Sequence, residues 1–109
     1  MAADMWQRRV RYGWQIHVLA LEIDIRIPLA ASLKDRRQVV RSLLDRARSR
    51  LNISAAEVGA QESHQRAVLG FAAVSSSAAE VEDVMDRVES LVWSCPDLEV
   101  VSADRSWLE

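Results

Sequence analysis

The fold is decided in residues 16–50, IHVLALEIDIRIPLAASLKDRRQVVRSLLDRARSR, where the spacing of apolar side chains changes from every second residue to a helical repeat. Over residues 16–27 apolar and polar side chains alternate, which predicts a half-buried strand that Pro28 ends. One face of this strand carries Leu19, Leu21, Ile23, Ile25 and Ile27, and the other carries Glu22, Asp24 and Arg26. The first face is predicted to enter the core, and the second to face water or a partner.

A helix is predicted to follow, from Ser32 to about residue 50. Ser32 stands three residues before Asp35, so its hydroxyl can accept from an early backbone N–H while the acid favours the helix N-terminus. The apolar side chains then recur at helical spacing, at Leu33, Val40, Leu43, Leu44, Ala47 and Leu51. This helix is therefore expected to bury one stripe and expose the rest.

The remainder of the chain repeats the same pattern. Residues 52–59 and 65–75 are predicted to form two strands, and a hairpin symmetric about the polar residues between them would place Glu57 opposite Arg66. A second helix is predicted to start at Ser77, and the last strand to cover residues 98–108. The order β-α-β-β-α-β predicts an α+β ferredoxin-like sandwich, in which two helices cover one face of a four-stranded antiparallel sheet and the other face is open.

Length and composition indicate one compact domain. The chain has 109 residues, of which 50% are hydrophobic and 28% are charged. The periodic pattern covers residues 16–109, so residues 1–15 are expected to be an extension that either lengthens the first strand or stays disordered. A nucleic-acid-binding arm is the alternative for this extension, because it mixes Trp and Tyr with arginines.

Charge is distributed unevenly along the chain. Residues 31–50 hold seven cations and two carboxylates, for a local charge of +5 in a chain whose net charge is −2. Four of these cations, Lys34, Arg37, Arg41 and Arg48, fall on one stripe of the helix, here called the basic line. Two explanations are open: the basic helix pairs with the acidic second helix, or it binds the phosphates of a nucleic acid.

The sequence motifs of the common enzyme classes are missing from this chain. It contains no glycine-rich phosphate loop, nucleophile elbow or metal-ligand spacing, and Cys95 is the single cysteine. We therefore predict no catalytic residue, no metal site and no cofactor, and a protein that is not an enzyme. The longest apolar run, residues 18–21, is far too short for a membrane span, and a cytoplasmic location is expected.

Three segments together resemble the YlxP-like family, small bacterial proteins that form a domain of unknown function. They are SLKDRRQVVRSLLDRARSRLNISAAEV, QESHQRAVLGFAAVS and SCPDLEVVS, and the resemblance covers about residues 17–108. The positions that match the family pattern are Ser32, Leu33, Lys34, Arg36, Arg37, Asn52, Ala56, Glu57, Val58, Gln65, Arg66, Ala67, Leu69 and Gly70. The resemblance implies a ferredoxin-like fold with no established activity or cofactor, and gene neighbours that act in translation and ribosome maturation.

The basic line and this resemblance together give the leading hypothesis. It is a non-enzymatic accessory protein that binds structured RNA or a ribosomal particle through Lys34, Arg37, Arg41 and Arg48. Glu57, Gln65 and Arg66 would order the end of the hairpin or contact the partner. The alternative hypothesis is a protein-interaction module that forms a homodimer through the open sheet face or an edge strand and binds no nucleic acid.

Overall fold

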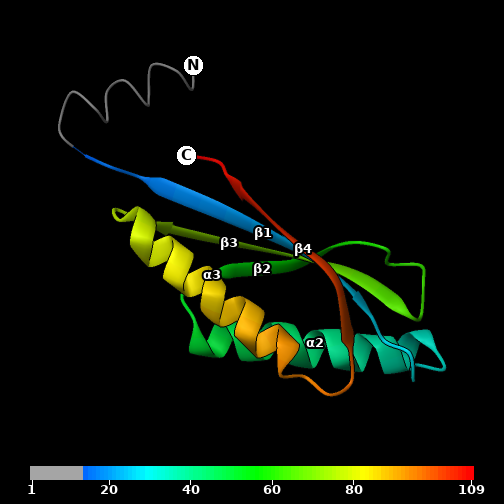
Figure 1. Cartoon of the computed structure of the whole chain (residues 1–109). Helices are drawn as coiled ribbons and strands as arrows, with labels where there is room; N and C mark the ends of the chain where they lie inside the picture. Colours follow the sequence, from blue (N-terminus) through cyan, green and yellow to red (C-terminus); the bar gives the residue numbers. More distant parts are fainter. Residues whose placement is uncertain (1–13) are drawn as a thin grey trace.

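The computed structural model describes residues 14–109, which form one sheet and two helices (Figure 1). Residues 1–13, most of the extension predicted above, lie outside the described residues. The elements in chain order are β1 (His17–Arg26), α2 (Leu33–Arg50), β2 (Ser54–Gly59), β3 (Arg66–Ser75), α3 (Ala78–Trp93) and β4 (Glu99–Trp107). The order β-α-β-β-α-β predicted from the sequence is confirmed.

The four strands form a single antiparallel sheet in the order β2-β3-β1-β4. The two central strands are paired over their full length, from His17 opposite Ser75 to Arg26 opposite Arg66. Since side chains alternate along a strand, this register turns the apolar residues of β1 and β3 to the same face. Those side chains are Leu19, Leu21, Ile23, Ile25, Ala67, Leu69, Phe71 and Ala73, all buried. This arrangement is the ferredoxin-like fold.

Both helices pack on that face of the sheet (Figure 1). The buried side of α2 comprises Arg36, Val40, Leu43, Leu44 and Ala47, and that of α3 comprises Val81, Met85, Val88 and Val92. Leu33, which we expected in the apolar stripe, is instead 39% exposed because it lies in the first turn of α2. The opposite face of the sheet is covered by neither helix, as predicted.

The two predicted helix starts are confirmed by their capping hydrogen bonds. The Ser32 hydroxyl accepts from the Asp35 N–H at 3.2 Å, and the Asp35 carboxylate accepts from the Ala31 N–H at 3.0 Å. At the second helix the Ser77 hydroxyl accepts from the Glu80 N–H at 3.3 Å. These bonds satisfy backbone donors that have no partner inside the helix and fix where each helix begins.

The predicted register of the β2–β3 hairpin is wrong. Glu57 pairs with Leu69 rather than with Arg66, and a register shift lies between Glu57 and Gly59. The pairing differs because the last pair of the hairpin is Gly59 with Val68, so the connection between the paired positions comprises residues 60–67 and not only residues 60–64. Ala60 has a positive φ of 58° at the start of this connection. Consequently Glu57 points to the face of the helices, while Arg66 points to the open face.

Candidate nucleic-acid interface

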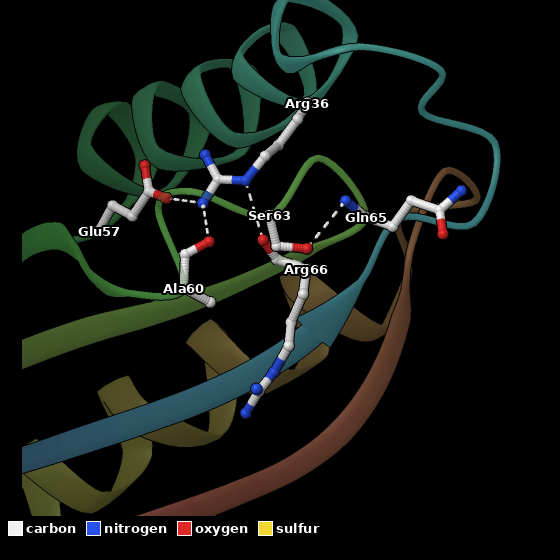
Figure 2. A network of polar contacts seen from close by, with 6 residues as sticks. All are labelled: Arg36, Glu57, Ala60, Ser63, Gln65 and Arg66. Carbon is white, nitrogen blue, oxygen red and sulfur yellow. Dashed lines mark hydrogen bonds and ion pairs between the residues drawn. The ribbon is translucent and has the colours of Figure 1, made fainter.

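A buried arginine connects α2 to the β2–β3 hairpin (Figure 2). Arg36 is only 2% exposed, and its guanidinium forms an ion pair with the Glu57 carboxylate. It also donates to the Ala60 carbonyl at 3.0 Å and to the Arg66 carbonyl at 2.8 Å. One side chain therefore holds a strand residue, the left-handed turn residue and the first residue of the next strand in fixed positions.

Burial affects the charge of this arginine without removing it. Desolvation, and after it the charge of neighbouring Arg37, lowers the pKa of Arg36 from its ordinary value. A guanidinium nevertheless stays protonated in proteins, and the three acceptors around Arg36 replace the water that it lost. In the part of the chain that the structure describes, no buried side-chain nitrogen or oxygen is left without a hydrogen bond. Arg36 is thus a structural cation, unavailable to a ligand.

Three cations of the basic line lie one after another along the solvent-exposed side of α2. Lys34, Arg37 and Arg41 are all exposed, and none has an ion pair or a side-chain hydrogen bond to another residue of the range 14–109. Together with Gln38, Ser42 and Asp45 they line a shallow hollow of about 390 Å³ on the helix. The structure therefore brings these three predicted site residues together and leaves their charges available.

The fourth cation of the basic line, Arg48, is partly engaged. Its guanidinium donates to the Ala55 carbonyl of β2 at 2.5 Å and pairs with Asp45 at 3.4 Å. Its side chain keeps 47% of its surface exposed. A second hollow, of about 240 Å³, lies between α2 and β2, and Arg37, Arg41 and Arg48 all line it. The basic line thus borders a concave surface that extends from the helix to the edge of the sheet.

The other predicted site residues lie elsewhere. The Arg66 side chain points away from α2 (Figure 2), and on the open face it binds the Asp24 carboxylate at 2.6 and 3.0 Å. The Gln65 side chain donates to the Pro28 carbonyl at 3.4 Å and connects the hairpin to the loop after β1. Glu57 is held by Arg36. These three residues order the end of the hairpin. Gln65 and Arg66 do not join the exposed cations, whereas Glu57 also lines the hollow between α2 and β2.

The ion pair on the open face perturbs both of its members. The hydrogen bond from Arg66 lowers the pKa of Asp24; burial opposes this effect and the charge of Arg66 adds to it. The same hydrogen bond and charge raise the pKa of Arg66. Asp24 therefore remains ionised well into acid, and its carboxylate offsets the charge of Arg66.

Pairing between the basic and the acidic helix, one of the two explanations left open by the sequence, is not seen in residues 14–109. Within the described chain no ion pair joins α2 to α3. Instead Asp86 and Glu89 of α3 bind Arg105 of β4, and Asp83 binds Arg87 in its own helix. Partial burial acts to lower the pKa of Arg105, but its hydrogen bonds to Glu89 and Asp86 outweigh this and raise it. Asp86 and Glu89 thus neutralise a strand arginine. The exposed cations of the basic line receive no carboxylate from α3 within residues 14–109.

The open face of the sheet lacks the features of a base-stacking surface. Its side chains on the central strands are Val18, Ala20, Glu22, Asp24 and Arg26 from β1 and Val68, Gly70, Ala72 and Val74 from β3. Small residues on these strands, with Ser54 and Ala56 of β2, surround a hollow of about 510 Å³. The lining of this hollow includes one aromatic residue, Phe71, which is 2% exposed and belongs to the core. The hollow therefore offers no exposed ring on which a base could stack.

Residues 14–109 contain no group of three or more His, Cys, Asp or Glu side chains that could hold a metal ion. Cys95 is buried and has a free thiol. Of the two helices described, neither is long and apolar enough to cross a membrane.

Arg36 was not predicted to be the central residue of the polar network, although the sequence carries a signal for it. Arg36 lies four residues before Val40 and seven before Leu43, so the apolar stripe already assigns it to the buried side of the helix. An arginine at the buried edge of a helix commonly covers apolar surface with its stem alone, whereas here the guanidinium is buried as well. A cation at a buried position requires an acid. Glu57 is the acid that the inward face of β2 supplies.

Comparison with known proteins agrees with the resemblance. A family model described as "Protein of unknown function (DUF503)" matches residues 18–105. The chain is also 37% identical over 78 residues to "Uncharacterized protein YlxP" of Bacillus subtilis, a match that covers 72% of this chain and 85% of that protein.

Proposed function

The chain belongs to the DUF503 family, and we propose that it is a non-enzymatic cytoplasmic protein that binds structured RNA or a ribosomal particle through the basic line. In this role it assists ribosome maturation or translation. One observation carries the proposal: Lys34, Arg37 and Arg41 are exposed on one side of α2, and no carboxylate of residues 14–109 pairs with them. Uncompensated cations in a row are the electrostatic footprint of phosphate binding.

The distribution of acids supports this choice of surface. Other conspicuous carboxylates of the domain lie on α3, where they bind Arg105 and Arg87, or on the open face, such as Glu22 and Asp104. A polyanion would be repelled by those surfaces and, among residues 14–109, attracted most strongly to α2. A chain with a net charge of −2 can therefore bind RNA at one defined place.

The proposal predicts a salt-dependent affinity for a structured RNA. Three free cations that each neutralise one phosphate give a log–log slope of about −2 to −3 between affinity and salt concentration. The measurement is a fluorescence-anisotropy titration with a labelled RNA hairpin at several salt concentrations. Arg37→Glu together with Arg41→Glu should abolish binding at physiological salt, because the substitutions place two carboxylates in the centre of the basic line.

A matched control is Arg26→Glu together with Arg87→Glu. Arg26 lies on the open face and Arg87 on α3, both exposed, so this variant changes the net charge equally without touching α2. It should weaken binding only slightly. Equal losses in the two double variants, or wild-type binding that is independent of salt, would contradict the proposal. A wild-type chain that ignores RNA and forms a salt-insensitive dimer would support the homodimer alternative instead.

A further inference from the structure

We infer that the ligand of the basic line is the backbone of an A-form RNA duplex, and that Gln38 and Ser42 contact its 2′-hydroxyl groups. This inference rests on the proposed function and narrows it to one class of nucleic acid. Two observations support it: polar, uncharged side chains lie among the cations, and no aromatic residue lines the hollow.

Two neutral hydrogen-bonding side chains lie among the cations. Gln38 and Ser42 are exposed, line the same hollow as Lys34, Arg37 and Arg41, and make no hydrogen bond through their side chains to another described residue. Since they are four residues apart, they stand one above the other on the helix. An amide and a hydroxyl can each donate to and accept from a 2′-hydroxyl, which does both itself.

The spacing of these groups suits a shallow groove. The line from Lys34 to Arg41 rises about 10 Å along the helix axis, at 1.5 Å per residue. The minor groove of A-form RNA is wide and shallow and displays 2′-hydroxyls beside the two phosphate backbones. A helix lying against this groove can place its cations on phosphates while Gln38 and Ser42 meet the sugars. B-form DNA offers the same phosphates but no 2′-hydroxyl.

A single strand would gain less from this surface. Proteins hold flexible single strands by stacking bases on aromatic rings, which contributes to affinity and offsets the entropy of ordering the strand. No aromatic residue lines either hollow that borders the basic line. The cations are fixed on one continuous helix, so they fit a backbone that is already rigid. A duplex satisfies this condition and an unpaired strand does not.

Asp45 marks one end of the surface. Its carboxylate lines the hollow beside Arg41 and Ser42 and pairs with Arg48 at 3.4 Å. A phosphate cannot approach this carboxylate closely, so the duplex backbone is expected to contact the end of α2 that carries Lys34 and Arg37. Arg48 then contributes mainly by neutralising Asp45.

The test compares four ligands of equal length with the intact protein: duplex RNA, duplex DNA, an RNA–DNA hybrid and single-stranded RNA without secondary structure. Duplex RNA should bind about tenfold more tightly than duplex DNA or the single strand, with the hybrid between. Gln38→Ala together with Ser42→Ala should lower affinity for duplex RNA about three- to tenfold and leave affinity for duplex DNA within about twofold. A control, Gln61→Ala together with Ser90→Ala, changes the same residue types at exposed positions outside α2 and should change neither affinity.

The outcomes separate this inference from the proposed function. Equal binding of single-stranded and duplex RNA, or of duplex RNA and duplex DNA, overturns the inference, while salt-dependent binding through α2 still supports the proposed function. Loss of duplex DNA binding in the Gln38 and Ser42 variant to the same extent as duplex RNA binding also overturns it. Failure to bind any of the four ligands overturns both.

Discussion

Arg36 shows how one residue can organise a structure without belonging to its binding surface. It is one of seven cations within 20 residues, yet it is 2% exposed and hydrogen-bonded to three separate segments. Its neighbour Arg37 is exposed and has no partner within residues 14–109. Adjacent positions on a helix point about 100° apart, so the phase of the apolar stripe buries one arginine in the polar network and leaves the other exposed on the proposed binding surface.

Replacing Arg36 should be strongly destabilising. Arg36→Met keeps most of the apolar stem but leaves the Glu57 carboxylate, which is 19% exposed, and two carbonyls without their donor. We expect a loss of about 2–4 kcal/mol in the free energy of unfolding, measured by urea denaturation. Arg37→Met, the exposed neighbour, should change it by no more than about 0.5 kcal/mol.

The double variant Arg36→Met with Glu57→Leu identifies the cause of that loss. Removing both charges eliminates the unpaired carboxylate, so part of the lost stability should return. If the double variant is as unstable as the sum of its single variants, the ion pair does not account for the effect, and the lost carbonyl contacts or packing must.

At the scale of the elements, cross-strand contacts fix how β1 meets its neighbours. Arg26 and Arg66 are directly opposite, an unfavourable pairing of like charges. Arg66 instead reaches diagonally to Asp24, two residues along β1, and makes two hydrogen bonds to it. Strand register therefore decides which acid binds Arg66. The hairpin expected from the sequence placed Glu57 opposite Arg66, whereas the structure pairs Arg66 with Asp24.

The Asp24–Arg66 pair predicts how stability depends on pH. Because Arg66 lowers the pKa of Asp24 in the folded state, the unfolded chain takes up this proton first as the pH falls. The stabilisation is therefore complete above the ordinary Asp pKa of about 4 and is lost as the pH falls through the lower folded pKa. Urea denaturation of wild type and Asp24→Asn at intervals from pH 7 to pH 2 should show a stability difference that is constant above about pH 5 and declines in acid.

A second variant checks the assignment of this effect. In Arg66→Met the carboxylate of Asp24 has lost its donor. The part of the free energy of unfolding that wild type loses in acid through Asp24 should therefore be absent from this variant. If Arg66→Met and wild type lose stability with identical pH profiles, the profile belongs to other carboxylates.

At the scale of the whole molecule, the fold separates its charges onto different surfaces. The two helices share one face of the sheet. Asp86 and Glu89 of α3 bind Arg105 of β4. The exposed cations of α2 face solvent or the edge formed by β2. The packed apolar face, rather than helix–helix ion pairs, holds the two helices on the sheet. The exposed cations of the basic line at Lys34, Arg37 and Arg41 have no ion-pair partner within residues 14–109. The proposed binding surface therefore adds little to the free energy of unfolding.

Hydrogen exchange should distinguish the central strand β1 from the edge strand β2. β1 is paired on both sides, with β3 and β4, and its inward residues Leu21 and Ile23 are each 1% exposed. Amides of β1 are therefore expected to exchange only through global unfolding, whereas β2, which pairs on one side only, should exchange through local opening. The measurement is native-state exchange by NMR in low urea. Faster exchange in β1 than in β2 would contradict this hierarchy.

Much of the architecture could be predicted from local pattern. Alternation in β1, the helical stripes of α2 and α3, and the caps at Ser32 and Ser77 depend on residues near one another in the chain, so sequence periodicity reports them directly. The exposed cations at Lys34, Arg37 and Arg41 could be predicted for the same reason, because one helix displays them.

The contacts that cross between elements were decided only by the tertiary structure. The register of the β2–β3 hairpin gives Glu57 to Arg36. The register of β1 against β3 gives Asp24 to Arg66. The packing of α3 over β4 gives its acids to Arg105 rather than to α2. Each of these partners is 16 or more residues away in the chain. The sequence by itself thus determined the elements and the charge on each, while three-dimensional packing determined which charges are neutralised inside the molecule and which remain for a ligand.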